Sequence, residues 1–167
     1  FGAIQLEDIS APRCFEIEAR LQERLKIPVM HDDQHGTAIV ILAGLINALK
    51  VVGKRLEDVR VVLNGAGAAG VATAKLLKVA GMRSFVAVDR TGVIYAGREG
   101  LNQEKQWLAE MSTEVQPGQT LADVVKGADV LIGVSAAGAF TKDMVQTMAP
   151  NSIIFAIANP VPEILPD

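Results

Sequence analysis

Residues 59–89 decide the fold, and they read VRVVLNGAGAAGVATAKLLKVAGMRSFVAVD. An apolar strand leads into a glycine-rich turn, an amphipathic helix follows, and a second apolar strand ends at Asp89. A strand, a G-x-G-x-x-G turn and a helix in this order are typical of the dinucleotide-binding βαβ unit. We therefore predict an α/β fold with a Rossmann-type, doubly wound parallel sheet.

Each glycine of the turn has a separate expected role. Gly65 permits the tight turn, Gly67 lets the backbone approach a pyrophosphate, and Gly70 lets the helix lie against the strand. The free N–H groups and the dipole at the helix N-terminus favour the phosphate charge. The alternative is a purely structural role, in which the glycines form a tight βα turn that binds no ligand.

The carboxylate at the end of the second strand bears on the choice of cofactor. Asp89 lies about 20 residues beyond the last glycine, where an acid bonds a ribose 2′-OH. A carboxylate there repels the 2′-phosphate of NADP⁺, whereas the neighbouring Arg90 is able to accommodate it. NAD⁺ is therefore slightly favoured over NADP⁺.

Composition narrows the class of protein. Half of the 167 residues are apolar and only 4% are aromatic, which suits a parallel sheet buried on both faces. The net charge is -3 and no basic stripe is present, so nucleic acid is not expected as a partner. Cys14 is the single cysteine, which indicates a reducing compartment such as the cytoplasm. The apolar run 38–48 is too short to cross a bilayer, so no membrane partner is expected.

The first 36 residues predict a second, smaller βαβ unit. Strands are expected at 1–6 and 27–31, with a helix between them, and the crossover implies that the strands are parallel. Their carboxyl ends then lie at one edge and bring four carboxylates together: Glu7, Asp8, Asp32 and Asp33. Such a cluster is stable when a hard cation such as Mg²⁺ or Mn²⁺ occupies it. The alternative is a set of solvated loop acids.

The pattern divides the chain into three parts. Residues 1–36 form the expected metal-site segment, and residues 56–167 form the expected NAD(P)-binding Rossmann domain. Residues 37–55 connect them. The helix expected at 37–51 is apolar nearly all round, which predicts burial between layers or lobes.

Polar residues follow two further predicted strands of the Rossmann domain. Ser135 comes directly after one strand and Asn159 after the next. Ligands of open parallel sheets bind beyond the carboxyl ends of the strands. Both residues are therefore candidates to contact the nicotinamide half of the cofactor or the substrate, although either alone also suits a turn.

Four motifs together resemble the malic enzymes of the compact bacterial kind. They are Gln5-Leu6-Glu7-Asp8, residues 31–38 (HDDQHGTA), the turn from Gly65 to Gly70, and Ala158-Asn159-Pro160. Their order and spacing match along essentially the whole chain. The resemblance implies that (S)-malate is oxidised by NAD⁺ or NADP⁺ to pyruvate and CO₂.

The resemblance also implies roles for individual acids. Glu7, Asp8 and Asp33 match the ligands of the divalent metal, and Asp32 matches an acid beside the metal that assists the proton-transfer groups. Asn159 matches an asparagine at the nicotinamide and substrate end. The turn that contacts the pyrophosphate is matched by four consecutive residues: Ala66, Gly67, Ala68 and Ala69.

The chain departs from the family's pattern in one respect. The family's tyrosine general acid and lysine general base precede the metal motif, and neither Tyr95 nor Lys54 matches them. We therefore expect a piece of a longer protein, which in full length is expected to form a homodimer. Two alternatives stay open, namely a metal-independent Rossmann dehydrogenase and a non-catalytic dinucleotide-binding domain.

Overall fold

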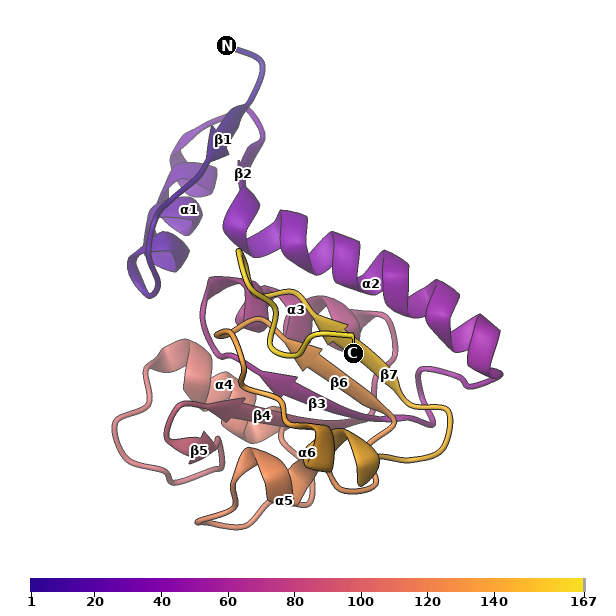
Figure 1. The fold of residues 1–167 in the computed structure, drawn as a ribbon. Helices are drawn as coiled ribbons and strands as arrows, with labels where there is room; N and C mark the ends of the chain where they lie inside the picture. Colours follow the sequence, from indigo (N-terminus) through magenta and orange to yellow (C-terminus); the bar gives the residue numbers. More distant parts are fainter. Residues whose placement is uncertain (167) are drawn as a thin grey trace.

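The computed structural model describes residues 1–166, and its centre is a five-stranded sheet (Figure 1). The strands lie in the order β5-β4-β3-β6-β7. Four of them are parallel, and β5 pairs with β4 in the antiparallel sense. Their bounds are β3 (Arg60–Asn64), β4 (Ser84–Asp89), β5 (Gly92–Val93), β6 (Val130–Gly133) and β7 (Ile153–Ala156).

Helices cover both faces of this sheet, so the predicted doubly wound α/β fold is confirmed (Figure 1). One face packs against α2 (Asp32–Val52), α3 (Ala68–Val79) and α4 (Gln103–Met111) through a cluster that includes Leu45, Leu77 and Leu108. The other face packs against α5 (Leu121–Val125) and α6 (Lys142–Gln146). Fully buried aliphatic residues on both faces of β3 explain why its sequence shows no polar alternation.

The N-terminal residues form the predicted second βαβ unit. β1 (Ile4–Leu6) and β2 (Val29–His31) pair in parallel as a separate two-stranded sheet, and α1 (Arg13–Arg24) connects them. The expected strand at 1–6 is shorter than predicted, since it begins at Ile4. The buried residues of α1 are Cys14 and, unexpectedly for an acid, Glu18.

The connecting helix differs from expectation at its start and in its burial. α2 begins at Asp32 rather than Thr37, because the two acids at its first turn favour the positive end of the helix. It ends where Gly53 adopts φ +70°. Within residues 1–166 only one side of α2 is buried, so the expected burial between layers or lobes is observed on that side alone. Its exposed large apolar residues are Ile39, Val40, Ile46 and Val51.

α2 is long and apolar enough to cross a membrane by length and composition, with a mean hydropathy of 1.7. Core helices of globular domains meet the same criterion. The buried residues Ile41, Leu45 and Leu49 of α2 belong to the same core cluster as β3 and α3. This packing is that of a core helix, and the absence of a membrane partner stays a prediction.

The turn between β3 and α3 has no room for side chains at two of its three glycines. A Cβ on Gly65, which has φ +121°, would lie 2.6 Å from the carbonyl oxygen of Val134. A Cβ on Gly70 would lie 1.8 Å from the carbonyl oxygen of Gly65. A Cβ on Gly67 would meet nothing within 4 Å. Gly65 and Gly70 are thus required by packing, whereas Gly67 faces open space.

This contrast predicts different effects of two alanine substitutions. Gly70→Ala forces α3 away from the turn, and we expect a loss of at least about 1–3 kcal/mol of unfolding free energy. Gly67→Ala is the matched control, and its melting temperature should stay close to that of the native chain. Thermal and urea unfolding of the two variants measure the difference. Equal stability of both variants would contradict the packing role of Gly70.

Candidate dinucleotide and metal site

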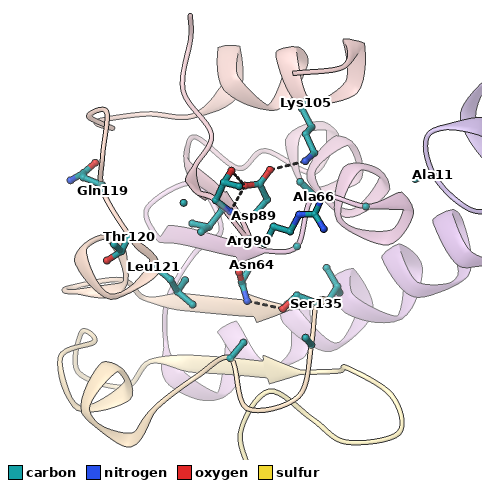
Figure 2. Close-up of a pocket in the computed structure, with 18 of the residues that line it drawn as sticks. Ala11, Asn64, Ala66, Asp89, Arg90, Lys105, Gln119, Thr120, Leu121 and Ser135 are labelled. Carbon is teal, nitrogen blue, oxygen red and sulfur yellow. Dashed lines mark hydrogen bonds and ion pairs between the residues drawn. The ribbon is translucent and has the colours of Figure 1, made fainter. Parts of the chain in front are cut away.

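A cleft of about 1000 Å³ opens beyond the carboxyl ends of β3, β4 and β6 (Figure 2). Its floor is the turn formed by Gly65, Ala66 and Gly67. Ala11 and Pro12, which precede α1, form part of its wall, so the small βαβ unit borders the same cleft. Six of the predicted cofactor residues line it together, namely Gly65, Ala66, Gly67, Asp89, Arg90 and Ser135.

The start of α3 suits a bound anion. The helix begins at Ala68, and Gly67 is its N-cap without a side-chain hydrogen bond. The first N–H groups of a helix have no intrahelical acceptor, and the helix dipole adds positive potential there. No acidic residue lies in this first turn. The turn therefore presents N–H donors to the cleft, as a pyrophosphate requires.

Asp89 is held by two cations that the sequence analysis did not anticipate, and Figure 2 shows one of them, Lys105. Arg98 Nη2 lies 2.8 Å from both carboxylate oxygens, and Lys105 Nζ lies 2.6 Å from Oδ2. Thr91 also donates to Oδ1 through its N–H and hydroxyl groups. Burial alone would raise the pKa of Asp89, but the bonds from Lys105 and Arg98 outweigh it and hold the pKa well below its usual range.

This ion cluster changes the expected electrostatics of the ribose site. Asp89 contributes one negative charge, whereas Arg98 and Lys105 contribute two positive charges within hydrogen-bond distance of it. The exposed Arg90 adds a third cation at the cleft. The region around Asp89 is therefore positive overall, and repulsion of a phosphate by Asp89 is weaker than the sequence alone suggested.

A second polar network joins the ends of β3, β6 and β7. Asn64 donates to the Ser135 hydroxyl group at 2.7 Å (Figure 2). The carboxylate of Glu163, which is fully buried, accepts from the N–H groups of Ser135 at 2.8 Å and Ala158 at 3.0 Å. Glu163 thus ties together the segments that carry both predicted nicotinamide-end residues. Asn159 itself is exposed and lies outside the residues that line the cleft.

Sequence reasoning missed Glu163 because it follows the last strand in a proline-rich segment, where an acid is normally solvated. It missed Arg98 and Lys105 because they lie 9 and 16 residues from Asp89 in the chain. One signal in the sequence could have indicated partners of this kind: a carboxylate at the end of a buried strand, such as Asp89, needs hydrogen-bond donors.

The predicted metal donors are only partly brought together. The parallel register places Leu6 opposite His31, so Glu7 and Asp32 follow paired positions. The Asp8 N–H group donates to Asp33 Oδ2 at 2.8 Å. Within residues 1–166, however, no three His, Cys, Asp or Glu side chains lie close enough to hold a metal ion. The carboxylate donors fit Mg²⁺ or Mn²⁺ chemically, but the expected convergence of all four is not observed.

Comparisons with known proteins agree with this arrangement. The family profile described as "Malic enzyme, NAD binding domain" matches residues 34–164. The chain is 56% identical over its whole length to the NAD-dependent malic enzyme of Geobacillus stearothermophilus, and it spans 35% of that relative. It is 53% identical to the NADP-dependent malic enzyme of Halomonas elongata and spans 39% of it.

A solved structure agrees in fold along nearly the whole chain. The NAD-dependent malic enzyme of Thermotoga maritima superposes with a TM-score of 0.95 and 44% identity, covering 99% of this chain and 45% of that structure. The similarity includes the small βαβ unit, because the coverage extends beyond residues 34–164 of the family profile. The chain therefore belongs to the malic enzyme family and contains its NAD-binding domain.

Proposed function

We propose that this chain is the dinucleotide- and metal-binding part of an enzyme that oxidises (S)-malate with NAD⁺ or NADP⁺ to pyruvate and CO₂. The observation that carries the proposal is the cleft over the glycine turn, in a chain that matches malic enzymes along its whole length. The matched relatives are named for NAD in one case and NADP in another, which supports a nicotinamide cofactor.

In this proposal the cofactor lies along the carboxyl ends of the strands. The pyrophosphate binds the N–H groups of the turn that begins α3, which comprises Gly65, Ala66, Gly67, Ala68, Ala69 and Gly70. The adenosine ribose lies beside Asp89 and Arg90. The nicotinamide lies toward Ser135 and Asn159, where β6 and β7 end. Asn159 also contacts the substrate.

The proposed metal donors are Glu7, Asp8 and Asp33. A divalent cation held there supplies Lewis-acid polarisation of the C2 oxygen of malate and stabilises negative charge left by the departing CO₂. Asp32, in the first turn of α2, is proposed to assist the proton-transfer groups. Neither Tyr95 nor Lys54 lines the cleft, so we assign the tyrosine general acid and the lysine general base to parts of the enzyme other than these 167 residues.

The proposed setting follows from the same similarity. The partner is a small molecule, malate or pyruvate, and the full-length enzyme is proposed to be a homodimer in the cytoplasm. The division into a metal-site segment at 1–36, a connection at 37–55 and a cofactor domain at 56–167 belongs to this proposal.

NAD⁺ remains slightly favoured, because Asp89 is positioned to accept from a ribose hydroxyl group. The cations around it allow NADP⁺ to bind as well. Of the two cations that bind Asp89, Lys105 is better placed for a 2′-phosphate, because its side chain is 29% exposed and lines the cleft. The side chain of Arg98 is 15% exposed and bonds the backbone oxygens of Gly92 and Val93.

We therefore expect Lys105→Met to discriminate between the two cofactors. Loss of the ammonium group should weaken NADP⁺ binding at least about tenfold, since a hydrogen bond to a charged group contributes about 1.5–3 kcal/mol. NAD⁺ affinity should change less, because it carries no 2′-phosphate. Isothermal titration calorimetry measures both, with Lys142→Met on α6 as the control. Equal losses for the two cofactors would contradict a role of Lys105 at the 2′-position.

The proposed function as a whole is tested by thermal-shift titration of this chain with NAD⁺ or NADP⁺, each with and without Mn²⁺ and malate. A ligand that binds only the folded state stabilises it by about 2.7 kcal/mol at one hundred times its Kd. We expect one or both cofactors to raise the melting temperature, and Mn²⁺ with malate to raise it further.

The other outcomes separate the alternative functions. A shift with cofactor that Mn²⁺ and malate never increase would favour a metal-independent dehydrogenase or a non-catalytic dinucleotide-binding domain. No shift with either cofactor would overturn the proposal that the cleft of this chain binds a dinucleotide.

A further inference from the structure

A buried acid on α1 organises the residues that lead into the proposed metal site. Glu18 is 6% exposed, and its carboxylate accepts from the backbone N–H group of His31 at 2.9 Å. It also accepts from Gln34 Nε2 at 3.1 Å and lies 2.9 Å from His35 Nε2. Burial of a carboxylate destabilises the folded state unless several hydrogen-bond donors satisfy it. Glu18 thus joins α1 to the end of β2 and the first turn of α2.

Gln34 lies between Glu18 and the ring of His31 and contacts both. The Gln34 side-chain nitrogen lies 3.1 Å from Glu18 Oε2 and 3.1 Å from His31 Nδ1. An amide nitrogen has two hydrogens and donates only. One hydrogen is directed to Glu18 and the other to Nδ1, so Nδ1 is the acceptor. The neutral His31 ring therefore carries its proton on Nε2.

The protonated nitrogen of His31 faces a proposed metal ligand. The His31 side chain is fully buried, and its Nε2 lies 3.1 Å from Asp33 Oδ2. Among residues 1–166, Nε2 has no well-aligned hydrogen-bond acceptor at this position of the carboxylate. The Asp33 side chain is 44% exposed, and its Oδ2 also accepts from the Asp8 N–H group at 2.8 Å. A small rotation of Asp33 would align it with the buried Nε2–H group.

We propose that Glu18, acting through Gln34, sets the tautomer of His31 so that His31 holds Asp33 Oδ2 and leaves Oδ1 for a divalent cation. Glu18, Gln34 and His31 are positioning residues in this scheme. The inference rests on the proposed metal-binding role of Asp33. Outer hydrogen bonds of this kind orient metal ligands and strengthen metal binding.

Glu18→Gln is the substitution expected to reverse the direction of the hydrogen bonds between residue 18, Gln34 and His31, which we call the Glu18–Gln34–His31 relay. An amide at position 18 has one acceptor oxygen in place of two, so the Gln34 amide gains by turning its oxygen toward His31. Nδ1 then becomes the donor, and the proton leaves Nε2. A lone pair on Nε2 would face the Asp33 carboxylate and repel it.

The first experiment reads the tautomer directly in the metal-free chain. The ¹⁵N chemical shifts of the His31 ring distinguish a proton on Nε2 from one on Nδ1. We expect the Nε2–H form in the native chain and mainly the Nδ1–H form in Glu18→Gln. The control is Glu16→Gln, the same change at an exposed position of α1, and it should match the native chain. A folded Glu18→Gln protein with an unchanged tautomer would overturn the inference.

The second experiment measures Mn²⁺ affinity by electron paramagnetic resonance, without cofactor or substrate. We expect Glu18→Gln to weaken Mn²⁺ binding about tenfold, as is typical for loss of an outer partner of a metal ligand. His31→Gln keeps an N–H donor toward Asp33 but has no tautomers. In that background Glu18→Gln should change Mn²⁺ affinity little. An equal loss in both backgrounds would show a merely structural role of Glu18 and overturn the inference.

Two provisions keep the test decisive. If Glu18→Gln does not fold, Gln34→Met keeps the Glu18 carboxylate and removes the amide that donates both to Glu18 and to Nδ1. It should shift the tautomer population and weaken Mn²⁺ binding, and failure to do both overturns the inference. If the native chain binds Mn²⁺ and the variants bind it equally well, the result contradicts only the proposed role of Glu18, Gln34 and His31. If the native chain binds no Mn²⁺, the result contradicts the proposed metal site, and the proposed role of Glu18, Gln34 and His31 is overturned as well.

Discussion

The parallel pairing of β3 with β4 on one side and β6 on the other determines where every polar group of the cleft lies. In this pairing Asn64 lies opposite Val88 on β4 and Gly133 on β6. The strands therefore end at one level, and the turn at Gly65, the acid at Asp89 and the hydroxyl group at Ser135 come together there. A shift of register by one residue would also turn the fully buried residues of β3 to the opposite faces.

Three acids of the structure, Asp89, Glu163 and Glu18, are satisfied by different kinds of hydrogen-bond donor. Asp89 borders the cleft and is bound by two cations, which keep it ionised. Glu163 and Glu18 are buried and accept mainly from backbone or side-chain N–H groups. Such buried acids orient their neighbours, because each bond has a defined direction and replacement by an amide removes one acceptor.

The elements were predictable where the signal is local. The glycine turn, the capping box at Thr120 and Asp123, and α4 from Gln103 to Met111 depend on residues close together in the chain, and the structure has all of them. The start of α2 was misplaced because Gly36 reads as a helix breaker. Gly36 lies inside α2, where a Cβ would lie 2.5 Å from Asp32 Oδ1, so glycine leaves room for the Asp32 side chain one turn earlier in the helix.

The cleft was predictable in position but not in charge. Its residues follow strands, and strand ends are visible in the sequence, whereas Arg98 and Lys105 reach Asp89 from a loop and from α4. Nothing in the local pattern marks them. The same reason hides Glu18 and Glu163, because solvation is the usual state of an acid and only tertiary structure shows its burial. Long-range polar contacts are therefore the part of this site that only the three-dimensional structure shows.

α2 connects the geometry of the two proposed sites. It is one continuous helix, so the direction of its first turn, which carries Asp32 and Asp33, is set by the packing of Ile41, Leu45 and Leu49 in the core farther along. That core also holds α3, whose N-terminus forms the glycine turn. The proposed metal donor Asp33 and the proposed pyrophosphate turn are thus positioned by one packed layer. Glu18 adds the missing constraint from the other side, because it binds both the end of β2 and the start of α2.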